Sequence, residues 1–540
     1  MKRNYIFILI FFYTLTGQSQ NPYFEIGKQM EIYNDVLKHL ATNYIDELNF
    51  GDLIQKNTRH LLNGLDRFTT YYDEQGILDQ KMRQEGHFSG IGISMQYKDS
   101  LLLVTRVYKD TPASKTLKVG DKILEIEGKK VADLERKVAV NILKGAKGTK
   151  VKVKLERNGK RIEKEIERQD IPLDAVTITQ LDGDIGYIRF VKFNKKASAQ
   201  VKMAILDLKK QGAQKLIIDE RGNPGGLLNE VVKIVNFFIP KGKVVVTTKG
   251  RFEKYNRTYA TKNESMDEEI PIVILVNNHS ASASEILSGS LQDYDRAVII
   301  GDTTYGKGLV QRTFKLTYGT YMKQTISKYY IPSGRLIQKI DYWHRDKNGK
   351  PLLMSANAEE KDYKTTNGRI VHNLGGVIPD IVIAEKNQES ILSDLKSKGY
   401  LFDFATWYYY QHPAPENIES FKLTDKDFED FIHYLQQNDT YPKSQAQLWV
   451  EKAYKKAENE GQSQDVLQAY NRLLDQYNQA NLEVLRKHKS YIIEQLYKDL
   501  TYRYFYLEGY TEYMLQNDKV IQKAKEVLNH PSEYNKILGR

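Results

Sequence analysis

Hydrophobic residues change their spacing along the chain, and each spacing predicts a different kind of element. Between residues 20 and 85 apolar side chains recur at helical intervals, for example Ile32, Val36 and Leu40, which predicts helices. Residues 151–155 and 162–166 alternate around the tight turn Asn158-Gly159, which predicts a β-hairpin.

Residues 185–300 alternate strand and helix patterns. Short strand-like runs at 185–190, 215–219 and 271–276 are separated by amphipathic or apolar helical patterns at 197–210 and 227–238. Such alternation predicts a layered α/β fold.

Beyond residue 389 the chain changes character, because glycine becomes rare and tyrosine and leucine dominate. Ile493, Leu496, Leu500 and Leu507 follow helical spacing, so we predict a helical extension. Its tyrosines fit packing better than a binding site. The pattern leaves open whether the extension covers an active site or joins subunits.

Candidate chemistry is concentrated after the apolar run at 271–276. A small-residue turn containing Ser280, Ser282 and Ser284 leads into a helical pattern, and Lys307 follows between two glycines. A serine activated by a lysine would suit this arrangement. The alternative for each serine is a purely structural role as a helix N-cap. Spacing alone favours Ser282 as the nucleophile but does not decide among the three.

A lysine can act as a base only when it is neutral. Its free pKa is ~10.4, so burial must lower it by roughly three units for use near pH 7. The apolar residues 298–300 and 309–310 are placed to supply that burial. The turn also offers the amide of Ala283, at a helix start, to hold an oxyanion.

A second glycine-rich turn lies between a predicted strand end and a helix start at residues 223–226. Ligand-binding loops occupy this position in α/β folds. It is either an ordinary turn or the second half of an oxyanion hole. In that case Gly225 or Gly226 presents an amide beside that of Ala283, and the sequence leaves the choice of glycine open.

Nucleotide binding is a rival interpretation of the lysine loop. Residues 301–307 match the start of a phosphate-binding P-loop, but Gly308 stands where Ser or Thr should ligate magnesium. A P-loop also opens a helix, whereas residues 309–314 predict a strand. We therefore reject this function.

Histidine chemistry is not expected either. His279 lies near Ser282, but in the same turn, too close along the chain to aim easily at the hydroxyl. The ten histidines show no pair at metal-ligand spacing on a plausible helix. We expect no metal and no organic cofactor.

These motifs together resemble the carboxy-terminal processing (tail-specific) serine peptidases. The family signature is a Ser-Ala-Ser-Ala-Ser-Glu turn, here at 280–285, and an aromatic-Gly-Lys-Gly loop ending in glutamine, here at 305–308 with Gln311. Similar motifs also stand at residues 216–226, 329–335 and 375–380, although the family usually has Asn where this chain has Gly222.

The resemblance covers roughly residues 55–385 and implies both fold and function. It implies a catalytic body of the crotonase or Clp-protease type. It also implies that Ser282 is the nucleophile, Lys307 the general base and Gln311 a residue that orients the lysine.

Residues 86–168 resemble the PDZ domain carried by the same peptidases. A PDZ domain adds a peptide as an extra strand and binds its terminal carboxylate with backbone amides. By position these amides belong to Gly90, Ile91 and Gly92. The turn at residues 116–121 is shorter than the family pattern.

The amino-terminal segment, the cysteine count and the net charge bear on where the protein is located and what it binds. Lys2, Arg3 and the short apolar stretch 5–15 predict a secretory signal peptide over residues 1–19, because the stretch falls short of the ~20 residues that span a bilayer. An uncleaved anchor is the less favoured alternative. The chain has no cysteine, which excludes disulfides and lipid attachment at the cleavage site.

The formal net charge is +11, but the basic residues are spread along the chain and mixed with acidic ones, and no nucleic-acid-binding motif is present. We therefore expect a solvated basic surface and no nucleic-acid partner.

The expected organisation of the 540 residues is a signal peptide (1–19), a helical region (20–85), a PDZ domain (86–168), a peptidase domain (169–388) and a helical extension (389–540). The expected activity is that of an exported periplasmic or extracellular serine endopeptidase. Its expected partners are proteins or peptides with apolar carboxyl-terminal tails, with homo-oligomers or an adaptor held through the last helices. The alternative is an idle PDZ-based peptide-binding or assembly protein.

Overall fold

The computed structural model describes residues 22–356, 359–373, 375–384 and 390–540. The predicted signal peptide therefore lies outside the described residues. The chain divides into two compact units, residues 1–71 and 72–540. No helix within the described ranges is both long and apolar enough to cross a membrane.

The first unit is helical, as its pattern predicts. It contains α1 (Pro22–Asn43) and α2 (Phe50–Asn63), and β1 (Thr70–Tyr72) lies at its boundary in sequence. Helix α2 begins after Asn49, whose side chain accepts a hydrogen bond from the backbone N–H of Asp52. Helix α1 buries none of its residues.

The second unit starts with α3 (Glu74–Glu85), which leads into the PDZ fold. Strands β2 (His87–Gly90) and β9 (Gln169–Pro172) pair where the chain enters and leaves this fold. The sheet between them has the order β3-β4-β5-β7-β8, with β6 beside β5. Its strands are β3 (Ile93–Lys98), β4 (Leu101–Val107), β5 (Lys122–Ile126), β6 (Lys129–Lys130), β7 (Lys150–Arg157) and β8 (Lys160–Glu167).

The predicted hairpin is confirmed in this sheet. Asn158 and Gly159 both have positive φ, at 47° and 73°, as a two-residue turn of the favoured hand requires. Helix α4 (Arg136–Leu143) and the short turns η1 (Pro112–Lys115) and η2 (Val131–Asp133) complete the fold. Strand β3 lies at the edge of the sheet, with β4 as its partner.

The catalytic body is built on a sheet with the order β10-β11-β12-β15-β16-β23. All neighbours run parallel except β10 and β11. The middle of β12 and the whole of β15 and β16 are apolar and buried, as parallel strands covered on both faces must be. The bounds are β10 (Val176–Asp182), β11 (Ile185–Phe190), β12 (Lys215–Asp219), β15 (Ile272–Val276), β16 (Val298–Gly301) and β23 (Ile381–Val382).

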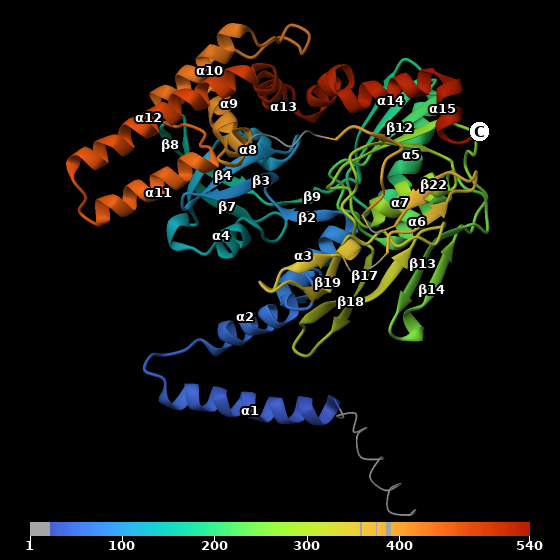
Figure 1. Cartoon of the computed structure of the whole chain (residues 1–540), viewed down its shortest axis with the longest axis horizontal. Coiled ribbons are helices and arrows are strands. Elements are labelled where there is room, and N and C mark those ends of the chain that lie inside the picture. Colours follow the sequence, from blue (N-terminus) through green and yellow to red (C-terminus); the bar gives the residue numbers. More distant parts are fainter. Residues whose placement is uncertain (1–21, 357–358, 374, 385–389) are drawn as a thin grey trace, which may run out of the picture. The chain divides into compact units, whose positions relative to one another are not determined.

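Helices α5 (Ala197–Lys210), α6 (Leu228–Val235) and α7 (Ala283–Asp293) cover one face of this sheet. Helix α6 ends before the predicted residue 238, because Asn236 leaves the helix and its side chain bonds the backbone of residues 262 and 263. On the far side of these helices lies a second, antiparallel sheet, which shares their apolar core (Figure 1). It contains β13 (Val244–Gly250), β14 (Arg257–Ala260), β17 (Leu309–Lys315) and β18 (Tyr321–Tyr330), with η3 (Glu253–Tyr255) after β13.

Two small hairpins follow in the chain. They are β19 (Ile340–Arg345) with β20 (Pro351–Leu353), and β21 (Asp362–Lys364) with β22 (Ile370–His372), with η4 (Met354–Ala356) between them. The predicted strand after the lysine loop is present as β17, so the rejection of a P-loop helix is confirmed.

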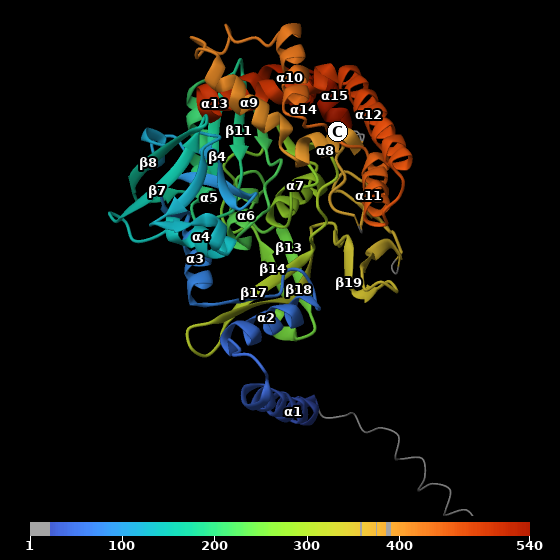
Figure 2. The same cartoon turned by 90° about the vertical axis from the view of Figure 1, so that its left-hand side faces the viewer.

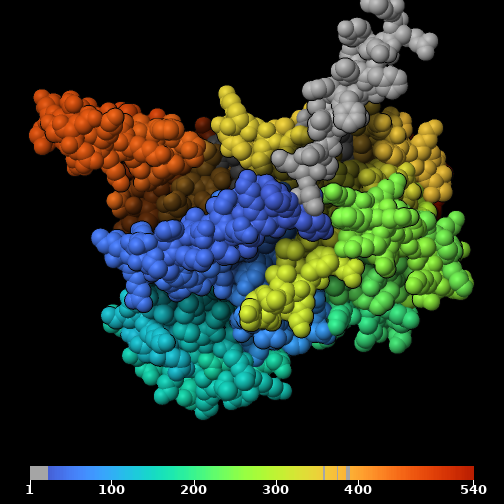
Figure 3. Space-filling view, turned by 90° about the horizontal axis from the view of Figure 1, so that it is seen from below, coloured from blue at the N-terminus to red at the C-terminus, as the bar shows by residue number. Residues whose placement is uncertain are grey.

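The carboxyl-terminal segment is helical, as predicted. Its helices are α8 (Ser390–Ser397), α9 (Tyr400–Gln411), α10 (Asp425–Gln437), α11 (Gln445–Asn459), α12 (Gln464–Lys487), α13 (Lys489–Asn517), α14 (Lys519–Asn529) and α15 (Pro531–Ile537). An aromatic core that includes Phe404, Tyr408 and Phe431 holds α9, α10 and α13 together. Helices α11 and α12 project from the rest of the second unit (Figures 1 and 3).

The last two helices take a place that the pattern did not predict. Ile521, Val527 and Tyr534 pack on the face of the catalytic sheet opposite α5–α7 (Figure 2). The Tyr534 hydroxyl accepts a hydrogen bond from the Ile272 N–H and donates one to the Ile272 carbonyl. The predicted fold class, an α/β body with a PDZ module and helical ends, is confirmed, and these helices complete the α/β body.

Candidate active site

Ser282 occupies a strained turn between β15 and α7. Its backbone has φ 58° and ψ −109°, a region that L-residues rarely adopt. Such a conformation costs on the order of 1–3 kcal/mol and persists only where its surroundings enforce it. The side chain is half-buried, so it lies within reach of an entering group.

The other two serines of the turn are fully buried and committed to the backbone. The Ser280 hydroxyl donates to the Glu220 carbonyl at 2.8 Å, and the Ser284 hydroxyl donates to the Asn223 carbonyl at 3.0 Å. These two hydroxyls hold the turn against the loop after β12. The structure therefore separates Ser282 from the two neighbours that spacing left open.

The carboxylate of Glu285 joins the serine turn to the lysine loop. One oxygen, Oε2, accepts the backbone N–H groups of Ser282 at 2.8 Å and Lys307 at 2.9 Å. The other, Oε1, accepts the Gly306 N–H at 2.6 Å and the Thr304 hydroxyl at 2.7 Å. Glu285 is fully buried, and burial raises its pKa while these hydrogen bonds oppose the rise.

The role of Glu285 was missed in the sequence. The signal was present, since Ser282 and Glu285 have the Ser-x-x-Glu spacing of a capping box. In this turn the glutamate does accept the backbone N–H at the head of the helix. The same carboxylate reaches a second segment as well, which no local pattern encodes.

The lysine loop fits closely against the chain after β18, and glycine permits that approach. A Cβ at Gly306 would meet the Lys339 Cβ at 2.4 Å, and Gly306 has φ +81°. Gly308 donates its N–H to the Gln338 side-chain oxygen at 2.7 Å. Lys307 between them is half-buried.

Gln311 lies on β17. Its amide donates to the Thr325 hydroxyl on β18 at 3.3 Å. Its predicted action on Lys307 stays a prediction. On the opposite side of the turn, the buried Tyr329 hydroxyl donates to the Ser282 carbonyl at 3.1 Å, and burial together with Glu285 raises the pKa of Tyr329.

The glycine loop after β12 lies directly against the serine turn. A Cβ at Gly225 would stand 2.7 Å from the Ala283 nitrogen and 3.0 Å from the Ser282 Cβ. The Gly225 N–H donates to the Asn223 side-chain oxygen at 2.9 Å. By contrast, the N–H groups of Gly226 and Ala283 make no hydrogen bond to any described residue. The structure thus places Gly225 against the Ala283 amide, with Gly226 next along the chain, and the amides of Gly226 and Ala283 have no acceptor among the described residues.

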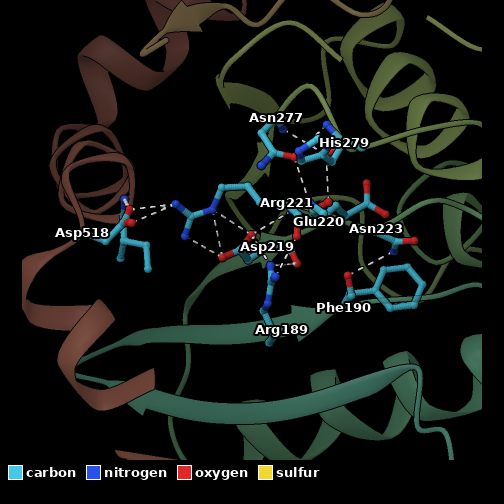
Figure 4. Close-up of polar contacts among 12 residues, drawn as sticks. Arg189, Phe190, Asp219, Glu220, Arg221, Asn223, Asn277, His279 and Asp518 are labelled. Atoms are coloured by element: carbon cyan, nitrogen blue, oxygen red, sulfur yellow. Dashed lines mark hydrogen bonds and ion pairs between the residues drawn. The ribbon is translucent and has the colours of Figure 1, made fainter. Parts of the chain in front are cut away.

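An ionic cluster anchors the strand from which this loop emerges (Figure 4). Arg221 donates from Nε and Nη2 to Asp219, and from Nη1 to both carboxylate oxygens of Asp518 at 3.0 Å. Arg189 also pairs with Asp219, at 2.8 Å. Burial opposes ionisation of Asp219, but the two guanidinium groups outweigh it and hold the pKa of its carboxyl well below the usual range.

Glu220 has the opposite surroundings. It is fully buried, and neither carboxyl oxygen has a hydrogen-bond partner among the described residues. Burial first, and the charge of Asp219 second, raise the pKa of Glu220 well above its ordinary value. The sequence carried one signal, an acid directly after the buried strand at 215–219, and it was overlooked.

In the PDZ fold the predicted carboxylate loop joins β2 to β3. Gly92 has φ +93°, and a Cβ there would meet Thr111 at 2.3 Å, so glycine is required. The carbonyls of Ile91 and Gly92 accept the N–H groups of Ala113 and Tyr108. Their own N–H groups have no acceptor within the described chain, whereas Gly90 belongs to the β2–β9 ladder.

Three segments of the chain match models of known protein families. Residues 184–342 match the model of peptidase family S41, residues 89–167 match a PDZ domain, and residues 391–528 match the "probable PDZ-protease, C-terminal helical domain". The carboxy-terminal-processing protease of Bartonella bacilliformis is 34% identical over 332 residues, which cover 60% of this chain and 75% of the relative.

Two further proteins are similar to this chain. The carboxy-terminal processing protease CtpA of Bacillus subtilis is 32% identical over 309 residues, which cover 57% of this chain and 66% of the relative. The solved photosystem II D1 C-terminal processing protease is 25% identical, covers 64% of this chain and 84% of that one, and has a TM-score of 0.37.

Replacing Glu285 by glutamine tests its bridging contacts. In Glu285→Gln one oxygen becomes an NH2 group, which faces the two N–H groups of Ser282 and Lys307 or, in the other orientation, the Gly306 N–H and the Thr304 hydroxyl. Each buried donor left without an acceptor costs about 1–3 kcal/mol. We expect the free energy of unfolding to fall by roughly 2–5 kcal/mol in urea titrations. Labelling of Ser282 by a fluorophosphonate should also slow. The exposed Glu264→Gln should change neither quantity, and a Glu285→Gln protein equal to wild type in both would contradict the role of this carboxylate.

Glu220 predicts a pH-dependent stability difference. An acid whose pKa is raised on folding is neutral in the folded protein but ionises in the unfolded chain, so it destabilises increasingly above the unfolded pKa of about 4.3. Glu220→Leu should therefore gain stability over wild type as pH rises from 4.5 to 7, by up to about 1.4 kcal/mol per pH unit. Calorimetric melting at several pH values measures this gain. A difference that stays constant with pH, like that expected for the exposed Glu264→Leu, would show that Glu220 is ionised in the fold.

Proposed function

Because this chain belongs to the carboxy-terminal-processing protease family of serine peptidases, we propose that it cleaves proteins near their carboxyl-terminal tails with Ser282 as nucleophile and Lys307 as general base. The observation that carries the proposal is the Glu285 carboxylate, which bonds the backbone of both residues at 2.8 and 2.9 Å. A contact of this kind fixes the two chain segments relative to each other, as a dyad requires.

The proposed reaction has two halves. The Ser282 oxygen attacks the peptide carbonyl while its proton passes to the Lys307 amine. The carbon–nitrogen bond then breaks, the proton moves from Lys307 to the leaving amine, and an ester to Ser282 remains. Water attacks this ester, gives a proton to Lys307 and releases the new carboxyl end, after which Ser282 regains its proton.

The developing negative charge needs hydrogen-bond donors. We assign this role to the backbone amides of Ala283 and Gly226, which lack an acceptor in the described chain. Gly225 lies closer to Ser282, and its amide joins them if it leaves the Asn223 side chain. Gln311 is proposed to orient the lysine from β17.

The PDZ fold is proposed to deliver the substrate. An extended tail adds to the open edge of β3, and its terminal carboxylate is held by the amides of Ile91 and Gly92 with Gly90 beside them. Proteins and peptides with apolar tails are the proposed partners. Contact with an adaptor or a second copy through the last helices is part of the proposal, and exposed Trp449 and Leu473 on α11 and α12 support it.

Export to the periplasm or cell envelope is proposed on the sequence of residues 1–19 alone. Lys2 and Arg3 precede a short apolar stretch, which is the order found in secretory signal peptides. Protein sequencing of the amino terminus after secretion would locate the cleavage site.

Loss of either dyad residue should abolish cleavage. With an unfolded protein that ends in an apolar tail, Ser282→Ala and Lys307→Met should each lower kcat by about 10³-fold or more. Mass spectrometry of the products measures the rate and the cleavage sites. The control is Lys315→Met, an exposed lysine at the end of β17, the strand that follows the lysine loop. Cleavage that survives both changes would refute the dyad, and tail binding without turnover by the wild type would favour an idle binding protein.

Tail recognition predicts a separate effect on KM. Substrates whose carboxyl terminus is amidated lose the charge that the loop before β3 would hold. We expect their KM to rise about tenfold or more with kcat nearly unchanged, since the lost interaction is remote from the cleaved bond. An amidated substrate processed with the same KM as the free acid would contradict carboxylate capture by Ile91 and Gly92.

A further inference from the structure

A cavity lies between the PDZ fold and the carboxyl-terminal helices. Its volume is about 160 Å³, and it is lined by PDZ residues 114–119 and by side chains of α9 and α13. This PDZ segment overlaps the turn at 116–121 that departs from the family pattern. The departure thus coincides with a surface that faces the helices and lies outside the proposed peptide-binding edge.

The helix on one side of the cavity is interrupted there. Tyr506, which lines the cavity, has φ 56° and ψ −152° within α13. A non-glycine residue in this region is strained by on the order of 1–3 kcal/mol, and such strain is concentrated at ligand clamps and switch regions. On the opposite side, Gly120 lies so close to α9 that a Cβ there would meet Thr406 at 2.3 Å. The cavity therefore lies between a closely packed PDZ turn and a strained turn of α13.

The charge of the lining favours an anion. Lys115, Lys118, Arg157 and Arg503 line the cavity, and none of its described lining residues is acidic. Arg157 is already paired with the buried Asp121 at 2.7 Å. Arg503 is likewise paired with Asp499, so Lys115 and Lys118 are the cations that leave the cavity positive.

Arg503 supplies the most specific observation. The residue is 7% exposed, and its Nε and Nη2 atoms donate to the Asp499 carboxylate and the Phe402 carbonyl. Its Nη1 atom is buried without an acceptor among the described residues. A buried polar group in this state costs about 1–3 kcal/mol, and more when it is charged. An acceptor entering the cavity would remove that cost.

Aromatic side chains complete the surroundings. Tyr409, Tyr502 and Tyr506 line the cavity, and the Lys118 ammonium lies 5.7 Å from the Tyr409 ring centroid. The buried hydroxyls of Tyr410 and Tyr504 also have no partner in the described chain, and both tyrosines interact electrostatically with Arg503. A cavity of about 150 Å³ accommodates a benzene ring.

We propose that this cavity binds a small organic anion, a carboxylate on a compact apolar or aromatic body. The carboxylate accepts from Arg503 Nη1 with Lys118 beside it, and the body packs among the tyrosines. Two sources offer this chemistry: a free small carboxylic acid, or the last residue of a polypeptide. In either case the occupant contacts PDZ residues 114–119 and α13 together, and so holds the PDZ fold to the helical segment.

The test uses the full chain and fluorine NMR of 4-fluorobenzoate. We expect its signal to broaden and shift with one site per chain, whereas uncharged 4-fluorobenzamide should not bind. Arg503→Met and Lys118→Glu should each weaken binding at least tenfold, and Lys129→Glu, on the exposed strand β6, should not. Since Arg503 is buried and its replacement can disturb folding, the rim variant Lys118→Glu decides alone if Arg503→Met fails to fold.

A second probe distinguishes the two sources. A tetrapeptide that ends in 4-fluorophenylalanine, with a free or an amidated carboxyl end, is titrated against the same variants. If Lys118→Glu weakens the free-acid peptide as it weakens 4-fluorobenzoate, a polypeptide end is the occupant. If it weakens only 4-fluorobenzoate, the occupant is a small acid. Absence of 4-fluorobenzoate binding to the wild type, or equal binding by wild type and Lys118→Glu, overturns the proposal.

Discussion

The acceptor geometry of Glu285 is the constraint on which the site depends. Ser282 stands in the turn before α7 and Lys307 in the loop before β17, so no strand places one residue against the other. A single buried carboxylate accepts from the backbone of both and from Thr304 and Gly306. Because four donors surround two oxygens, the carboxylate has little freedom to move without leaving buried N–H groups unpaired. The strained backbone of Ser282 is enforced in part by this bond.

The same dependence on buried polar contacts extends to the helical end of the chain. Asn223 ties the glycine loop to the serine turn through its backbone, while Arg221, two residues earlier, bonds Asp518 at the start of α14. Helix α13, which ends next to Asp518, also contacts the PDZ fold through Tyr502, whose hydroxyl donates to the Val107 carbonyl at 3.5 Å, and through Glu508, which pairs with Lys109. Helix α13 therefore touches the PDZ fold at Tyr502 and Glu508, and Asp518 at its carboxyl end bonds Arg221 in the loop behind the oxyanion amides. The PDZ fold is thus connected to that loop through α13 and through non-covalent polar contacts at both places.

Elements that depend on local periodicity could be predicted from the sequence, and contacts between distant segments could not. The hairpin at Asn158-Gly159 and the buried strands β12 and β15 follow from alternation and from apolar runs, and α5 has the predicted bounds. The placement of α14 and α15 on the catalytic sheet could not be predicted, because an amphipathic pattern shows that one face is buried without naming what buries it. For the same reason the sequence offered Ser282 and Lys307 as candidates, but only the capping-box spacing of Ser282 and Glu285 was visible in it, and not the contact of Glu285 with the lysine loop.

Asp219 and Glu220 show that adjacent residues of the same type can differ in a way that the sequence does not indicate. They are adjacent acids at the end of one strand, and successive side chains of a strand point to opposite faces. Asp219 points to the face that carries Arg189 and Arg221 and is stabilised as an anion, whereas Glu220 is buried with no cation and no donor in reach among the described residues. Composition treats the two residues as equal charges, yet the fold holds one ionised and favours the neutral form of the other. The chemistry of this loop is therefore decided by strand alternation and by the arginines on a single face, and only the three-dimensional arrangement assigns each acid its state.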